Sequence, residues 1–234
     1  MDLSFNIFRV LHIAAGFAAL FLLWIPIITK KGGKLHNQSG WVYVWAMALV
    51  SFSAFYMGIY RIFFDANPAP ERISFSWFLI FIALLSAASS YYGIRVLRHK
   101  KRTERHRHPL DLFVSLLLLC SGAGISLYGL INGLALITYF PLIGIFVALT
   151  QLMYWFRPPV RKMHWLFEHF SGMFTCCIST VTAFLVFGAP RLLDIESQNM
   201  LLWFLPTILF VPLIIGFSVH YSRRYNPSKK SLKG

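Results

Sequence analysis

The stretch LDLFVSLLLLCSGAGISLYGL at residues 110–130 is followed by ING at 131–133 and then by LALITYFPLIGIFVALTQLMYWF at 134–156. An α-helix rises about 1.5 Å per residue, so about 20 apolar residues cross the roughly 30 Å hydrocarbon core of a bilayer. Each run has that length, and Asn-Gly between them is typical of a tight turn. The sequence therefore predicts two membrane-crossing helices here. One continuous helix would instead reverse the side of every later loop.

Five further apolar runs of similar length lie at 5–28, 41–60, 73–94, 167–188 and 200–221. Only 13% of the 234 residues are charged and the mean hydropathy is +0.63, whereas a soluble domain has about 25% charged residues. We therefore expect an all-α fold, a polytopic transmembrane helix bundle of about seven spans. It forms a single domain over residues 1–222, followed by a basic cytoplasmic tail at 223–234.

The distribution of Lys and Arg predicts the orientation of this bundle. Basic residues are retained on the cytoplasmic side during insertion. With seven spans and an outside N-terminus, the cytoplasmic segments hold most of the 22 basic residues, and only Arg9, Arg61, Arg72 and Arg191 stay on the outer side. This asymmetry predicts a cytoplasmic C-terminus in a multi-pass protein of the inner (plasma) membrane.

The formal charge of +14 could by itself suggest a nucleic-acid binder. Its confinement to loops on one side of the membrane favours contact with the bilayer and with anionic inner-leaflet lipids instead, and we expect no nucleic acid. The densest segment runs from Arg95 to Arg107 and includes His99 and His106, with His108 next to it. We interpret it as a solvated, lipid-contacting face and assign it no catalysis.

Intramembrane histidines are candidate functional residues, because an ionisable group in lipid is costly unless it is paired. Neutral imidazole is the usual axial ligand of haem iron in helical bundles. His169 and His220 both lie about 13 Å inside their span centres, and His36 lies in the short loop at 30–40. Either His36 with His169, or His169 with His220, can hold one haem. His12, about 20 Å from His169 along the membrane normal, cannot share it, and a structural hydrogen bond explains it equally well.

A zinc site is the alternative for the same region, with the ligands His36, His164, Glu168 and His169. However, His164 and His169 are separated by five positions, which places them about 140° apart around a helix. A spacing of four suits one metal ion better. Glu168 can instead orient a histidine or pair with a nearby cation. Met173 can ligate a soft metal, although filling a packing gap is the commoner role of a buried Met.

Two blocks of the sequence resemble a family of bacterial predicted multi-pass membrane proteins of unknown function. The first block is His12-x-x-x-Gly16, followed by Lys31-Gly32-Gly33-x-x-His36-x-x-x-Gly40-x-x-Tyr43-x-x-x-Met47, and the second is His169-x-x-x-Met173 with Thr182-Ala183-Phe184. The resemblance implies a role for five residues, namely His12, His36, Gly40, His169 and Met173. Asn37 stands where such loops commonly place a basic residue. The family carries no established activity.

Three functions remain open from the sequence. The first is a membrane-embedded redox protein that binds haem b, with His169 as its principal ligand. The second is a small transporter or membrane assembly factor whose histidine cluster binds or relays a proton or metal ion. The third, a zinc-dependent membrane hydrolase, is disfavoured because no acidic residue lies deep in a span. GxGxxG, Walker, GxSxG and HExxH motifs are missing from the sequence, so nucleotide-dependent or standard hydrolase chemistry has no support.

Overall fold

A computed structural model describes residues 3–66, 69–193 and 200–226. This part of the chain is helical and contains no strand. In chain order the elements are α1 (Leu3–Leu22), α2 (Trp24–Ile28), α3 (Lys34–Phe63), α4 (Pro70–Arg95), the 3₁₀ turn η1 (Val96–His99), α5 (Pro109–Ile131), α6 (Ala135–Tyr139), α7 (Pro141–Phe156), α8 (His164–Ala183), the π-helical segment η2 (Phe184–Gly188), α9 (Ala189–Leu193) and α10 (Met200–Tyr225).

Seven helical stretches within the described residues are long and apolar enough to cross a membrane. This confirms the predicted all-α, multi-pass architecture. Large apolar side chains such as Phe52, Phe146 and Ile208 point outward and are more than half exposed. A contiguous apolar exterior of this kind is stable in lipid and not in water. Of the predicted basic tail, residues 227–234 lie outside the described part of the chain.

The predicted break between the fourth and fifth spans is present. Helix α5 ends at Ile131, and the chain reverses through Gly133, whose φ of +67° favours a residue without a side chain. The fifth span is itself bent, because Pro141 lacks the N–H that would continue the hydrogen bonding of α6 into α7. Two helices therefore cross the membrane between residues 109 and 156.

A similar break divides the first span at Leu23. Pro26 has no N–H to donate to the carbonyl of Leu22, so α1 stops and the short helix α2 follows. Helix α3 then begins at Lys34, earlier than the predicted start at 41, after Gly32 (φ +75°) turns the chain and Gly33 enters the helix in an extended conformation. His36 and Gly40 therefore lie on a helix and not in the predicted loop.

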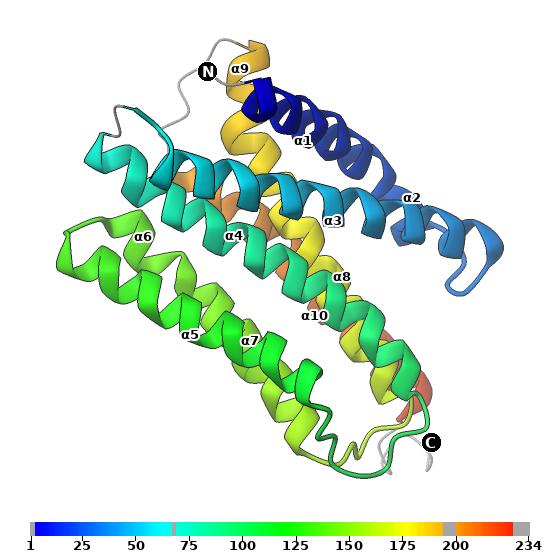
Figure 1. Cartoon of the computed structure of the whole chain (residues 1–234). Helices are drawn as coiled ribbons and strands as arrows, with labels where there is room; N and C mark the ends of the chain where they lie inside the picture. Colours follow the sequence, from blue (N-terminus) through cyan, green and yellow to red (C-terminus); the bar gives the residue numbers. More distant parts are fainter. Residues whose placement is uncertain (1–2, 67–68, 194–199, 227–234) are drawn as a thin grey trace.

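Helices α4 and α8 form the centre of the bundle. In each of these two spans 56% of the most apolar window is buried, against 17% for the first and last spans. Helix α4 packs against α3, α5 and α8, and α8 packs against α10 as well. In Figure 1 the α1 and α3 pair lies on one side of α4, and the α5 and α7 pair on the other.

The connections with most of the basic residues lie at one end of the bundle, which we call the basic end. It comprises residues 29–33, 96–108, 157–163 and the last turn of α10. The start of α1 and the connection between α5 and α6 lie at the other end (Figure 1). Of the residues predicted to bind a cofactor, all except His12 lie at or near the basic end.

Candidate functional site: a histidine-lined cavity

A cavity of about 740 Å³ opens at the basic end between α2, α3, α8 and α10. Its size lies within the range of pockets that hold small molecules and cofactors, roughly 300 to 1,000 Å³. The walls are mainly apolar and aromatic, and they include Phe170, Phe174 and Phe217. His36, His169 and Met173 line the same space. Three of the five predicted cofactor-binding residues therefore meet in one cavity.

The two cavity histidines come from different helices and face the same space. The ring centres of His36 on α3 and His169 on α8 lie 6.4 Å apart, and the ring planes make an angle of 68°. Both side chains are half-buried. The fold therefore brings these two imidazoles close together.

Each of these imidazoles is held by a backbone carbonyl. His36 Nδ1 lies 3.0 Å from the oxygen of Pro26, and His169 Nδ1 lies 2.7 Å from the oxygen of Gly93. A carbonyl oxygen only accepts, so Nδ1 is the donor in both rings. Nε2 then carries the lone pair in the neutral ring, which is the form that ligates a metal. No group in the described part of the chain hydrogen-bonds to either Nε2.

The position of His169 depends on a close contact between α4 and α8. A Cβ added to Gly172 would lie 2.9 Å from the Cα of Gly93, so neither position has room for a side chain. A Cβ added to Gly93 would also lie 3.0 Å from Met173 Sδ. The two backbones therefore touch. This contact brings the Gly93 carbonyl within hydrogen-bonding distance of the His169 imidazole, which lies one turn before Met173.

Gly40 provides open space one turn after His36. A Cβ added there would meet nothing within 4 Å, although the residue lines the cavity. Residues four apart lie on the same helical face, so the face of α3 that carries the imidazole also carries a position without a side chain. This leaves room beside His36 for a bulky ligand.

Cationic side chains surround the opening of the cavity. Lys31, Lys100 and Arg224 contribute to its lining. Lys31 Nζ donates to the carbonyls of Pro26 and Ile27 at 2.7 and 2.6 Å, which satisfies the last carbonyls of α2. Burial lowers the pKa of Lys31, because desolvation disfavours the ammonium form. Lys100 and Arg224 also line the opening, so it suits an anionic group, whereas the aromatic interior suits an apolar one.

His12 and His220, also predicted as cofactor ligands, do not line this cavity. His12 Nδ1 contacts the Val50 carbonyl at 3.1 Å and Ser53 Oγ at 2.9 Å, so it joins α1 to α3. His220 is exposed on α10. The rotation of α10 turns it away from the cavity that His169 lines, so the expected His169–His220 pair is not formed.

The alternative zinc set is dispersed. His164 Nδ1 lies 2.9 Å from the hydroxyl of Tyr154, and Glu168 accepts a 2.5 Å hydrogen bond from the Tyr92 hydroxyl. Neither residue lines the cavity of His36 and His169. The wide angular separation on α8 explains this result, because His164 and Glu168 face α4 and α7 instead.

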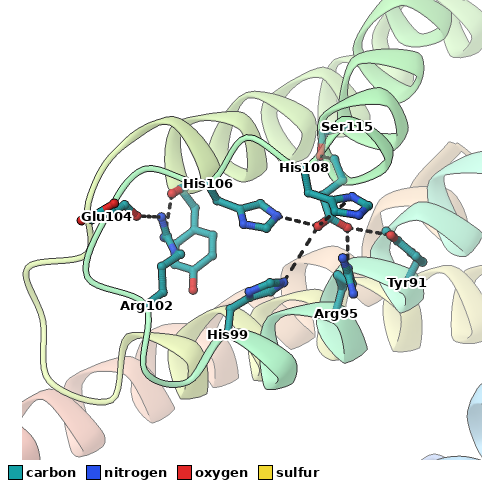
Figure 2. Close-up of polar contacts among 10 residues, drawn as sticks. Tyr91, Arg95, His99, Arg102, Glu104, His106, His108 and Ser115 are labelled. Carbon is teal, nitrogen blue, oxygen red and sulfur yellow. Dashed lines mark hydrogen bonds and ion pairs between the residues drawn. The ribbon is translucent and has the colours of Figure 1, made fainter.

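A second polar cluster, which the sequence did not predict, lies beside α5. Pro109 begins α5 and Asp111 lies in its first turn, where a carboxylate is favoured by the helix dipole. In Figure 2 the contacts of Tyr91, Arg95 and His106 converge on this buried carboxylate. The sequence signal is one acidic residue three positions after the last histidine of a segment rich in histidines and cations.

The connection at 96–108 is therefore not simply a solvated face. Arg102 donates to the carbonyls of Tyr154 and Arg157 at 2.9 and 3.0 Å, and its guanidinium stacks on the Tyr154 ring at 4.2 Å. These carbonyls belong to the C-terminal end of α7, whose acceptors lack helical partners. The connection is anchored to α7, although Arg98, Lys101, Arg105 and Arg107 remain exposed.

No protein-family model, no curated protein and no solved structure matches this chain. The fold and the site together define a class, namely a multi-pass helical membrane protein with a histidine-lined cavity between its spans.

Proposed function

We propose that this protein binds haem b between His36 and His169 and carries single electrons within the inner (plasma) membrane. The observation that supports this most directly is the separation of the two imidazoles. A metal bound by two imidazoles lies about 2 Å from each ligating nitrogen, which itself lies about 1 Å from its ring centre, so the ring centres are about 6 Å apart. The rings of His36 and His169 are separated by 6.4 Å.

The hydrogen bonds of the two rings also support ligation. Metal-bound histidines almost always donate their second N–H to a carbonyl, carboxylate or water, which fixes the tautomer and raises the basicity of the ligand. His36 and His169 both donate from Nδ1 to a carbonyl. These hydrogen bonds leave Nε2 of both rings available to bind a metal.

The cavity matches the polarity of haem b, which has an apolar macrocycle and two carboxylate groups. The aromatic walls, with Met173 and the open position at Gly40, fit the macrocycle. Lys31, Lys100 and Arg224 are the residues that would meet the carboxylates. When bound, haem supplies a centre that gains and loses one electron, and its potential is set by axial ligands and burial.

We further propose that the basic end faces the cytoplasm. Positive residues at this end would hold it there during insertion and attract anionic inner-leaflet lipids. Arg98, Lys101, Arg105 and Arg107 are the exposed side chains suited to that contact. The haem would then lie near the cytoplasmic surface of the membrane.

The optical spectrum of the detergent-purified protein tests the haem proposal. After expression with added haem precursor, the wild-type chain should show a Soret band, and His36→Ala and His169→Ala should each lose most of it. His12→Ala and His220→Ala are matched controls, because they remove histidines that do not line the cavity. A colourless wild-type protein, or equal loss in all four variants, would contradict the proposal.

A second candidate is a metal-handling transporter or assembly factor. The same cavity is lined by Met173 and Cys177, whose sulfur atoms favour soft metals such as copper(I). This function predicts a colourless protein that holds stoichiometric copper, and copper loss in the His169→Ala variant. Elemental analysis of the sample used for the spectrum separates the two candidates.

A further inference from the structure

The carboxylate of Asp111 has two oxygens with different surroundings. Oδ1 accepts hydrogen bonds from the Tyr91 hydroxyl at 2.6 Å and from Arg95 Nε at 2.7 Å. Oδ2 instead faces imidazoles. His106 Nε2 lies 2.6 Å away, and the ring nitrogens of His108 and His99 lie at 3.8 and 4.0 Å. One fully buried carboxylate oxygen therefore has ring nitrogens of three histidines within 4.0 Å.

His99 is the member of this group that points most directly to a bound ion. Its Nε2 is buried and has no hydrogen-bond partner, although it is directed toward Asp111 (Figure 2). A buried polar nitrogen without a partner is uncommon and calls for an explanation, such as an ion. Arg95 and Tyr91 hold Oδ1, so Oδ2 is the oxygen that would bind an ion, which would replace the 2.6 Å hydrogen bond between Oδ2 and His106 Nε2.

We propose that His99, His106 and Asp111 bind one Zn²⁺, with His108 as the fourth ligand. Imidazole nitrogens and a carboxylate oxygen are ligands that Zn²⁺ accepts in tetrahedral sites. Bonds of about 2.0 to 2.1 Å place tetrahedral ligand atoms about 3.4 Å apart. In the structure the ligand atoms of His99, His106 and Asp111 all lie within 4.8 Å of one another. Metal binding would lengthen the 2.6 Å contact between His106 Nε2 and Asp111 Oδ2 and would draw His99 and His108 closer to the carboxylate.

The elements around the cluster position these ligands before a metal binds. The His106 ring packs at 4.5 Å from the ring of Trp155, and the His106 backbone N–H donates to the Trp155 carbonyl. His99 lies in η1, directly after α4, and Asp111 lies in α5. A bound ion would join α4, the connection at 96–108 and α5, and the occupied four-ligand site would be structural.

This site is independent of the haem proposal. None of its ligands lines the cavity of His36 and His169, and the cluster lies on the other side of α4, beside α5 and α7. Among the described residues, no other group of three or more His, Cys, Asp or Glu side chains has ligand atoms that all lie this close to one another. Loss of one metal site should therefore leave the other intact.

Cobalt(II) titration of the purified full-length protein tests the zinc site. After chelator treatment, the wild-type chain should bind one equivalent of Co²⁺ with the visible absorption of a tetrahedral complex, and Zn²⁺ should displace it. His99→Gln should weaken binding by about 100-fold or more, because a direct ligand matters at least as much as its supporting residues. His99 Nε2 makes no hydrogen bond in the structure, so this change removes no hydrogen bond at that nitrogen.

Two controls make the result decisive. His220→Gln should bind Co²⁺ as the wild type does, since this residue belongs to neither the cluster nor the cavity. Zn²⁺ should also raise the unfolding temperature of the wild type and leave that of His99→Gln unchanged. Equal Co²⁺ affinity of the wild type and His99→Gln, or no binding by either, would show that the cluster is only an internal charge network and would overturn the proposal.

Discussion

The imidazole of His169 donates a 2.7 Å hydrogen bond to the carbonyl of Gly93, which lies on the neighbouring helix α4. The bond forms because α4 and α8 touch where Gly93 faces Gly172. The orientation of a candidate ligand therefore depends on two residues without side chains. Nδ1 is used by the backbone, and Nε2 is left for the cavity.

Gly172→Ala should disturb this arrangement. The new methyl group would lie 2.9 Å from Gly93 Cα, so the two helices must separate. We expect a loss of about 1 to 3 kcal/mol in the free energy of unfolding, as for other overpacked interfaces, and haem binding weakened by about 10-fold or more. Detergent unfolding and haem titration measure the two effects. Gly124→Ala is the control, because a Cβ there meets nothing within 4 Å. Identical behaviour of the two variants would refute this role of the helix contact.

Gly40→Leu should fill the cavity without disrupting the fold. The position is open in the structure, and replacing a helical glycine gains up to about 1 kcal/mol of helix propensity. We therefore expect normal expression and thermal stability together with loss of the Soret band. Gly16→Leu, on a helix with equally open space, should keep the band. Haem retention in Gly40→Leu would show that the ligand does not occupy the space beside His36.

Arg95→Ala should be strongly destabilising. Arg95 pairs with Asp111 at 2.7 Å, and the Asp111 side chain is fully buried. Removing one partner of a buried pair leaves an unpaired charge and costs about 3 to 5 kcal/mol. Arg72→Ala removes a 3.2 Å ion pair with Asp65 whose Arg side chain is 56% exposed, and such surface pairs contribute at most about 1 kcal/mol. Chemical unfolding measures the free energy of unfolding of both variants. Similar losses of this free energy would argue against a buried network at Asp111.

Single cysteines at the two ends of the bundle test the membrane orientation. Arg105→Cys places a thiol in the connection at 96–108, and Asn132→Cys places one between α5 and α6. In intact cells a membrane-impermeant maleimide should label Asn132→Cys and not Arg105→Cys, because the proposed topology places the basic end in the cytoplasm. The parent chain controls for its own three cysteines. The opposite labelling pattern would reverse the proposed topology.

The membrane-spanning architecture was predictable from the sequence because it depends on composition and length. Seven apolar runs separated by turns and charges define seven spans in any packing arrangement. Even the short break at Gly133 was visible, since its backbone conformation suits glycine. The bend at Pro141 was not predicted, although its cause is local.

The candidate sites were only partly predictable, because depth along a helix does not determine its rotation. His220 faces outward from α10, whereas His36 lines the cavity from the first turn of α3, which begins earlier than hydropathy indicates. The Asp111 cluster was missed for a different reason. Its formation requires the connection at 96–108 to fold back onto the end of α7, a tertiary contact that a run of charges does not reveal.

The central claim is that His36 and His169 together hold one haem, and electron paramagnetic resonance of the oxidised protein tests it most directly. Two imidazole ligands should give a low-spin ferric signal in the wild type. His36→Gly should convert that signal to high-spin or lose the haem, and added free imidazole should restore the low-spin form. A low-spin signal that His36→Gly leaves unchanged, or a wild-type protein without haem, would contradict the account.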